Sequence, residues 1–72
     1  MPLIDIHVME GVFDADEKAQ MIAACARAFG SVAGPAMERA TSVRVHEVPS
    51  GAWGGSTEVW TTARALELKA SG

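Results

Sequence analysis

The sequence predicts a small α/β domain in which one helix connects two parallel strands. Residues 3–9 and 41–48 both alternate apolar and polar side chains, which is typical of strands with one buried face. Between these segments, apolar residues recur at helical spacing over residues 15–32. A strand, a helix of this length and a second strand form a right-handed βαβ unit, so we expect the two strands to pair in parallel.

The first strand and the helix carry recognisable signals. One face of the strand carries Ile4, Ile6 and Val8. Asp14 is placed to cap the helix, and Glu17, three residues later, completes a capping box. Gly34 and Pro35 follow the helical pattern, and this pair predicts that the helix does not continue beyond them.

The second strand has a clear alternating pattern, whereas the secondary structure of the tail is ambiguous. Val43 and Val45 occupy one face of the second strand, whereas Arg44 and His46 occupy the other. Residues 49–55 contain the proline and glycines of two turns. The tail, residues 56–72, fits both a strand and a short helix, and we expect it to pack on a neighbouring subunit. The 72 residues are expected to form a single domain.

Composition and charge exclude several classes of function. The net charge is −3 and there is no run of Lys or Arg, so we expect neither nucleic acid nor a membrane as partner. No segment has the length of a membrane span, and no secretion signal is present, which favours the cytoplasm. One cysteine and no Cys/His cluster predict neither a disulfide framework nor a zinc site, and no cofactor is expected.

The apolar content predicts self-association. Hydrophobic residues make up 49% of the chain, more than a core of this size can enclose easily. A sheet of two strands is also not independently stable. We therefore expect a homo-oligomer that buries apolar side chains and strand edges between copies.

Pro2 is the leading candidate for a catalytic residue. A small residue in second position normally allows removal of Met1, which would leave a free prolyl amine. An α-amino group titrates near pH 8, and burial or nearby cations lower its pKa toward the range that general-base catalysis requires. The alternative is that Pro2 only precedes an edge strand, and with Met1 retained its nitrogen is an amide without basicity.

Several segments together resemble the 4-oxalocrotonate tautomerase family. These are the start at Pro2, the run Ile-His-Val-Met-Glu-Gly before the helix, Thr-Ser-Val-Arg-Val in the second strand, and Gly-Ala-Trp-Gly-Gly at residues 51–55. The resemblance covers about residues 2–55. It implies a cofactor-independent tautomerase that interconverts enol and keto forms of a 2-oxo acid. It also implies βαβ subunits that pair into a four-stranded sheet with helices on one face, in a hexamer built as a trimer of dimers.

The resemblance assigns roles to particular positions. Pro2 matches the catalytic proline that transfers a proton, and Arg44 matches the arginine that binds a carboxylate or polarises the 2-oxygen of a small carboxylate substrate. Trp53 matches an aromatic wall of the pocket. Val12 stands where many members have an arginine for a distal carboxylate, which favours a substrate with an apolar end. His46 shares a strand face with Arg44 and is a candidate for binding substrate or relaying a proton, the alternative being an interface histidine.

The sequence allows alternatives for the missing cation, for His7 and for the reaction. Arg39 or Arg64 of a neighbouring chain could supply the cation that is missing at Val12. His7 shares a face with Asp5, which favours a structural hydrogen bond between them. The resemblance also implies that hydration, dehalogenation or decarboxylation can use the same proline within the same family fold. The non-enzymatic alternative is that the chain is a structural subunit of a mixed hexamer.

Overall fold

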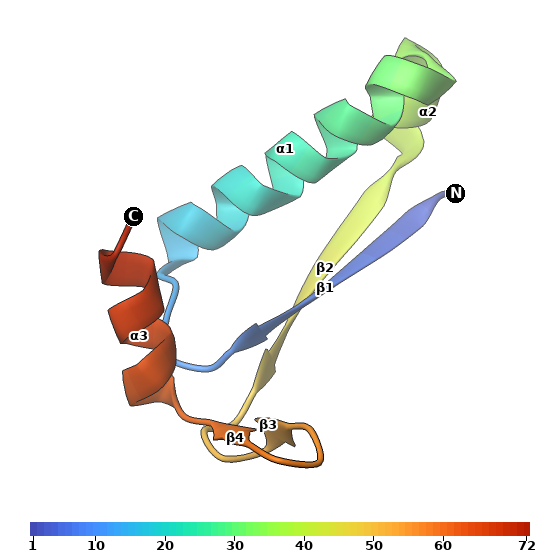
Figure 1. The fold of residues 1–72 in the computed structure, drawn as a ribbon. Helices are drawn as coiled ribbons and strands as arrows, with labels where there is room; N and C mark the ends of the chain where they lie inside the picture. Colours follow the sequence, from blue (N-terminus) through green and yellow to red (C-terminus); the bar gives the residue numbers. More distant parts are fainter.

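Two parallel strands form the centre of the structure, as the sequence predicts. In the computed structural model, β1 (Leu3–Met9) and β2 (Ser42–Val48) run side by side along their whole length (Figure 1). Asp5 lies opposite Arg44, and His7 lies opposite His46. The sheet has no third strand, so each strand keeps one unpaired outer edge.

Helix α1 (Ala15–Ala33) covers one face of this sheet. It begins with the predicted capping box, in which Asp14 Oδ1 accepts a hydrogen bond from Glu17 N at 2.8 Å and Glu17 Oε1 accepts one from Asp14 N at 3.0 Å. The covered face of β1 carries three half-buried apolar side chains, Ile4, Ile6 and Val8. Lys18 Nζ on the helix contacts Glu47 Oε1 on β2 at 2.7 Å. Glu47 therefore belongs to the helix-covered side, and not to the side of Arg44.

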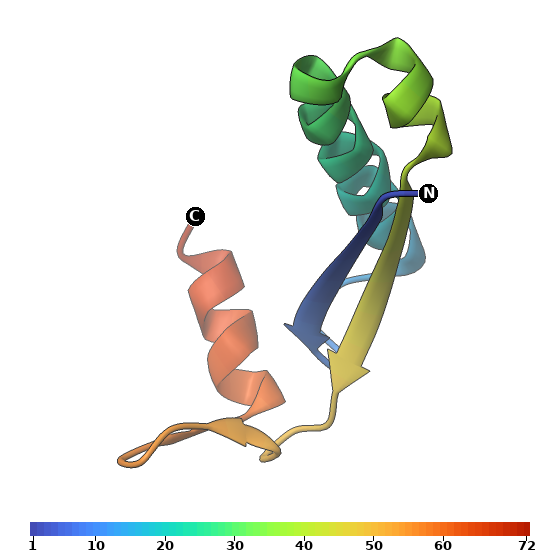
Figure 2. The same cartoon turned by 90° about the vertical axis from the view of Figure 1, so that its right-hand side faces the viewer.

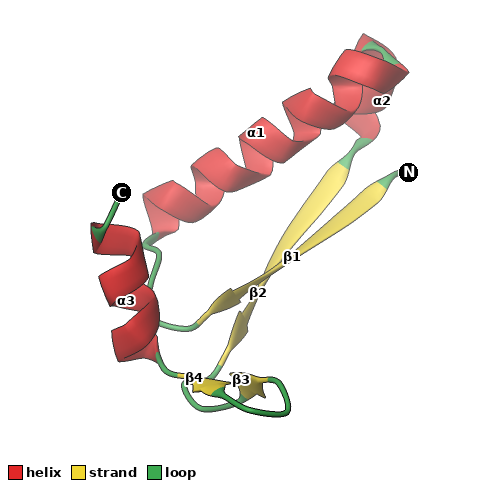
Figure 3. Ribbon diagram, in the orientation of Figure 1, coloured by secondary structure: helices red, strands yellow, loops and turns green.

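A second helix, α2 (Pro35–Ala40), follows α1 and was not expected from the sequence. Gly34 ends α1 and adopts a φ of 100°, a left-handed conformation that glycine tolerates best. Pro35 then opens the new helix, because a proline lacks only an amide hydrogen that the first turn would leave unpaired anyway. The Gly34-Pro35 pair thus stops one helix, as predicted, and starts another. Helix α2 returns the chain to the start of β2 (Figure 3).

The tail contains both structures that its sequence allows. β3 (Trp53–Gly54) and β4 (Val59–Trp60) form a short antiparallel hairpin, and α3 (Thr62–Ala70) follows directly. Thr61 caps α3 by accepting a hydrogen bond from Arg64 N at 3.2 Å. Thr62 Oγ1 then donates to Glu10 O at 2.7 Å, which anchors α3 beside the end of β1. Figure 2 shows α3 beside the ends of the two strands and α2 near their starts.

The folded chain is extended and encloses very little. Only Met9, Val12 and Gly30 are buried. The radius of gyration is 14.5 Å, whereas a compact chain of this length would have about 11 Å. Many apolar side chains remain exposed, including Leu3, Val32, Val59 and Leu68. No helix has the length and apolar character required to cross a membrane.

Candidate functional site

Pro2 and Arg44 lie in the same open hollow. This hollow has a volume of about 380 Å³ and is lined by Met1, Pro2, Leu3, Ser42 and Arg44. Parallel pairing creates it, because Pro2 O accepts a hydrogen bond from Ser42 N at 2.9 Å and fixes the start of β1 beside the start of β2. Two of the residues that the sequence selects as functional are thus neighbours, although 42 positions separate them along the chain.

The nitrogen of Pro2 is part of an amide in this structure, because Met1 precedes it. The ammonium group of Met1 donates a hydrogen bond to Ala40 O at 2.6 Å, and the Met1 residue is 89% exposed. An amide nitrogen has no useful basicity. The base chemistry expected of Pro2 therefore requires a chain from which Met1 has been removed.

Arg44 is held by a carboxylate on the neighbouring strand. Its Nε lies 3.4 Å from Asp5 Oδ1, and its side chain is 60% exposed. The hydrogen bond from His46 is the main cause that lowers the pKa of Asp5, and the positive charge of Arg44 lowers it further. Asp5 is thus ionised at neutral pH. The sequence led us to expect Asp5 only as a hydrogen-bond partner of His7, and its contact with Arg44 was not predicted.

The two histidines of the sheet lie on the same face as Arg44. His46 Nε2 is 3.1 Å from Asp5 Oδ1, so the expected partner of Asp5 is replaced by His46. The ring of His7 instead stacks on His46, with centroids 4.7 Å apart and ring planes at 16°. His46 is therefore joined to Arg44 through Asp5, and this is the closest link that the structure gives between His46 and the hollow at Pro2.

Val12 and Trp53 lie at the opposite end of the sheet. Val12 is buried and lines a hollow of about 450 Å³ between the start of α1 and the helix α3. Trp53 is 39% exposed and shares an apolar hollow with Met9, Trp60, Ala65 and Leu68. Since β1 separates the two ends and a seven-residue strand spans about 20 Å, a single chain does not bring Val12 or Trp53 to Pro2.

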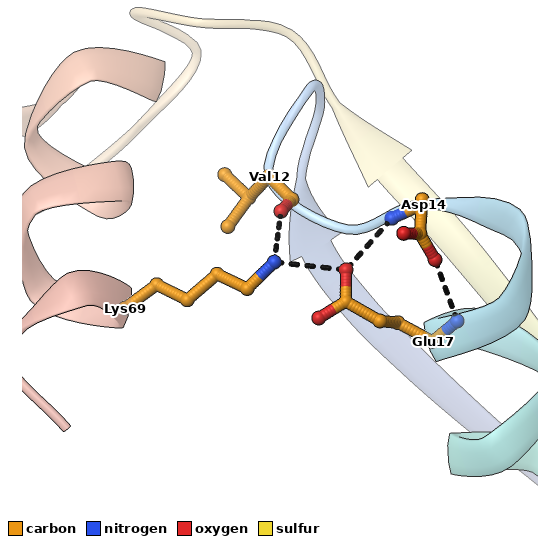
Figure 4. A network of polar contacts seen from close by, with 4 residues as sticks. All are labelled: Val12, Asp14, Glu17 and Lys69. Atoms are coloured by element: carbon orange, nitrogen blue, oxygen red, sulfur yellow. Dashed lines mark hydrogen bonds and ion pairs between the residues drawn. The ribbon is translucent and has the colours of Figure 1, made fainter.

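The cation nearest to Val12 is Lys69, which the sequence reasoning missed. Lys69 Nζ donates hydrogen bonds to Val12 O at 2.9 Å and to Glu17 Oε1 at 2.8 Å (Figure 4). The bond from Lys69 is the main cause that lowers the pKa of Glu17. No local sequence pattern signals this contact, because 57 positions separate Lys69 from Val12.

The two arginines considered as substitutes lie elsewhere within the chain. The guanidinium of Arg64 stacks over Trp60 at 4.0 Å and lies 3.5 Å from Glu58. Arg39 belongs to α2, at the far end of the molecule from the loop that carries Val12 (Figure 1). Their contribution from a neighbouring chain stays a prediction.

The polar groups near Pro2 fit anion binding and proton transfer. An always-charged guanidinium can hold a carboxylate, and a prolyl amine can accept a proton once it is free. No group of three or more His, Cys, Asp or Glu residues is arranged to hold a metal ion. No family model matches the chain, and no curated protein gives a significant match. The resemblance to the tautomerase family therefore depends only on the sequence segments between Pro2 and residue 55 that were compared above.

Proposed function

We propose that the chain is the subunit of a cofactor-independent tautomerase that interconverts the enol and keto forms of a 2-oxo acid. The observation that carries this proposal is the shared hollow of Pro2 and Arg44. This pairing joins a potential base with a fixed cation at the position where the resemblance expects both. The coarse fold, a small α/β unit with parallel strands, is compatible with it.

The proposed chemistry needs few groups. After removal of Met1, the Pro2 amine takes a proton from one position of the enol acid and returns a proton to carbon, so no proton is consumed overall. Arg44 holds the carboxylate or the 2-oxygen and stabilises the negative charge that develops there. A positive charge close to a free prolyl amine would also disfavour protonation of that amine.

The site would be completed by other copies of the chain. Catalysis of this kind gains from exclusion of water, yet the hollow at Pro2 is open in a single chain. Val12 and Trp53 can approach Pro2 only from another subunit, since within one chain both lie beyond the far ends of β1 and β2. The open sheet edges and exposed apolar side chains are the surfaces that such an assembly would bury. We propose pairing into a four-stranded sheet and assembly into a hexamer.

The substrate proposed is an enol mono-acid with an aryl or alkyl tail. Val12 provides no charge for a distal carboxylate, and Lys69, the cation that contacts its carbonyl oxygen, is already paired with Glu17. The apolar surroundings of Trp53 suit a tail of this kind.

A non-catalytic subunit is the second candidate, and it corresponds to a chain from which Met1 is not removed. A chain that keeps Met1 has a blocked Pro2 and an N-terminus bonded to Ala40. Such a chain could serve as an inert partner in a mixed hexamer. Hydratase, dehalogenase or decarboxylase activity would need a carboxylate that activates water in the hollow, and Asp5 is already engaged by Arg44 and His46.

Intact mass and enol–keto kinetics on the same preparation test the proposal. The processed chain should tautomerise phenylenolpyruvate, and Pro2→Ala should lower kcat/KM by about 10²–10⁴, the usual contribution of a general base. Arg44→Ala should also lower it, whereas Arg27→Ala, which removes an exposed arginine from α1, is the matched control. Full activity in Pro2→Ala, or in chains that still carry Met1, would show that the prolyl amine is not the base.

A further inference from the structure

The face of the sheet that α1 leaves uncovered carries a cluster of four polar side chains. We name the group Asp5, Arg44, His7 and His46 the cross-strand cluster. Its members form two directly opposed pairs, Asp5 with Arg44 and His7 with His46. Opposed residues in neighbouring strands have their side chains close together, so parallel pairing in this register brings the four groups into contact.

Asp5 forms an ion pair with Arg44 through the Nε atom, and not through the fork that we define as the two terminal nitrogens of the guanidinium. The contact of this pair joins Asp5 Oδ1 to Nε at 3.4 Å, a distance of charge contact. A guanidinium binds a carboxylate in two-pronged fashion through fixed, planar donors. With Nε directed at Asp5, the two terminal nitrogens remain available to a ligand in the hollow that Arg44 lines.

Asp5 is itself held in place by the histidines. An ionised carboxylate only accepts hydrogen bonds, so His46 Nε2 must donate the proton across the 3.1 Å to Asp5 Oδ1. His7 packs against the His46 ring, with the two ring planes at 16°. The contacts thus run without a gap from His7 through His46 and Asp5 to Arg44.

We propose that Asp5 is a positioning residue, which aims the fork of Arg44 at the substrate carboxylate in the hollow beside Pro2. This inference rests on the proposed tautomerase function for its kinetic consequence. It does not follow from the resemblance, in which only Pro2, Arg44 and Trp53 have assigned roles.

Two effects of Asp5 oppose each other, and the experiment separates them. The negative charge of Asp5 weakens the attraction of Arg44 for an anion. Orientation strengthens binding, because a long, exposed side chain no longer has to be ordered when the substrate arrives. The hydrogen bond from His46 offsets part of the negative charge of Asp5, so we expect orientation to dominate and the loss of Asp5 to weaken binding.

The kinetic test compares Asp5→Ala with Asp5→Asn. Asp5→Ala should raise KM for phenylenolpyruvate by about tenfold with kcat changed less than about twofold, since orientation is lost while the base is intact. Asp5→Asn keeps an oxygen that can accept from Nε, and should restore KM to within about threefold of the unmodified chain. Glu47→Gln is the control, because it disturbs the ion pair with Lys18 on the helix-covered face of the same sheet. A KM that falls or stays constant in Asp5→Ala would overturn the proposal.

A second measurement does not depend on catalysis. The Nε–H signal of Arg44 in a ¹⁵N–¹H spectrum, assigned by its loss in Arg44→Lys, should exchange with water more slowly than the other arginine signals. Asp5→Ala should remove this protection and Asp5→Asn should keep most of it. An Arg44 signal that is the same in all three chains would refute positioning. If the unmodified chain is inactive while its Arg44 signal depends on Asp5, the tautomerase proposal fails and the positioning role stands.

Discussion

Replacing Gly30 with alanine should destabilise the fold by pressing α1 against α2. Gly30 is one of three buried residues, and a methyl group there would overlap the Cβ of Glu38 and lie 2.7 Å from its Cγ. The Cβ atom cannot rotate away, so α2 as a whole must shift. Overpacking costs about 1–3 kcal/mol, and a clash with a Cβ that cannot rotate away belongs to the upper part of that range, about 2–3 kcal/mol, while alanine in place of glycine gains about 1 kcal/mol of helix propensity. We expect a net loss of about 1–2 kcal/mol.

Thermal unfolding followed by circular dichroism provides the assay. A loss of about 1–2 kcal/mol corresponds to a Tm lower by about 4–16 °C for a domain of this length. Chains must be compared at equal concentration, since association adds to apparent stability. Gly55→Ala is the matched control, because nothing lies within 4 Å of the added methyl group and Tm should hardly change.

A second background isolates the clash itself. In a chain that carries Glu38→Gly, the Cβ that collides with the new methyl group is gone, so Gly30→Ala should become neutral or stabilising. An equal loss of Tm in both backgrounds, or no loss in the first, would refute the steric argument. The outcome bears on the site, since α2 leads directly into Ser42, whose amide binds Pro2 O.

Three further predictions concern assembly, substrate and pH. Light scattering at micromolar concentration should give several times the 7.5 kDa of one chain, and a stable monomer would contradict the shared site. The kcat/KM for phenylenolpyruvate should exceed that for 2-hydroxymuconate by about 10- to 150-fold, the value of one missing charge-assisted hydrogen bond; a strong preference for the diacid would point to Lys69 as the distal cation. The pKa values of Asp5, Glu17 and Glu47 lie below their ordinary values of 3.8 and 4.5, so these groups stabilise the fold above pH about 4.5. Tm should stay flat above that pH and fall below it as the carboxylates are protonated, and Lys69→Met should reduce this fall. A Tm that rises on acidification would contradict the sign.

Local patterns in the sequence determine the regular elements well. The alternation of apolar residues predicts β1 and β2, and the capping box of Asp14 and Glu17 places the start of α1 correctly. Helix α2 was not predicted, because Gly34-Pro35 was interpreted only as the end of α1. Proline also suits the first turn of a new helix. The tail was ambiguous because the two-residue strand β4 is followed almost directly by α3. Only Thr61, the N-cap of α3, separates the two elements.

The contacts of the candidate site depend on register and on distant pairing, and these leave no local signal. Whether Arg44 faces Asp5 or His7 is decided by how α1 and α2 return the chain, and a shift of one residue would move Arg44 to the covered face. The sequence places Asp5 and His7 on one face, but their true partners are on β2. The bond between Lys69 and Val12 likewise depends on the path of the whole tail.

The two open edges of the central sheet decide what kind of assembly the chain can form. If a copy adds through the same edge on both chains, a twofold axis relates them and that interface is satisfied after one addition. If the outer edge of β1 instead accepted β2 of the next copy, every addition would expose a new β1 edge and growth would not stop. A closed particle and a fibre are thus alternative products of the same two strands. The side chains that border the second edge, and not the strength of the first pairing, decide between them.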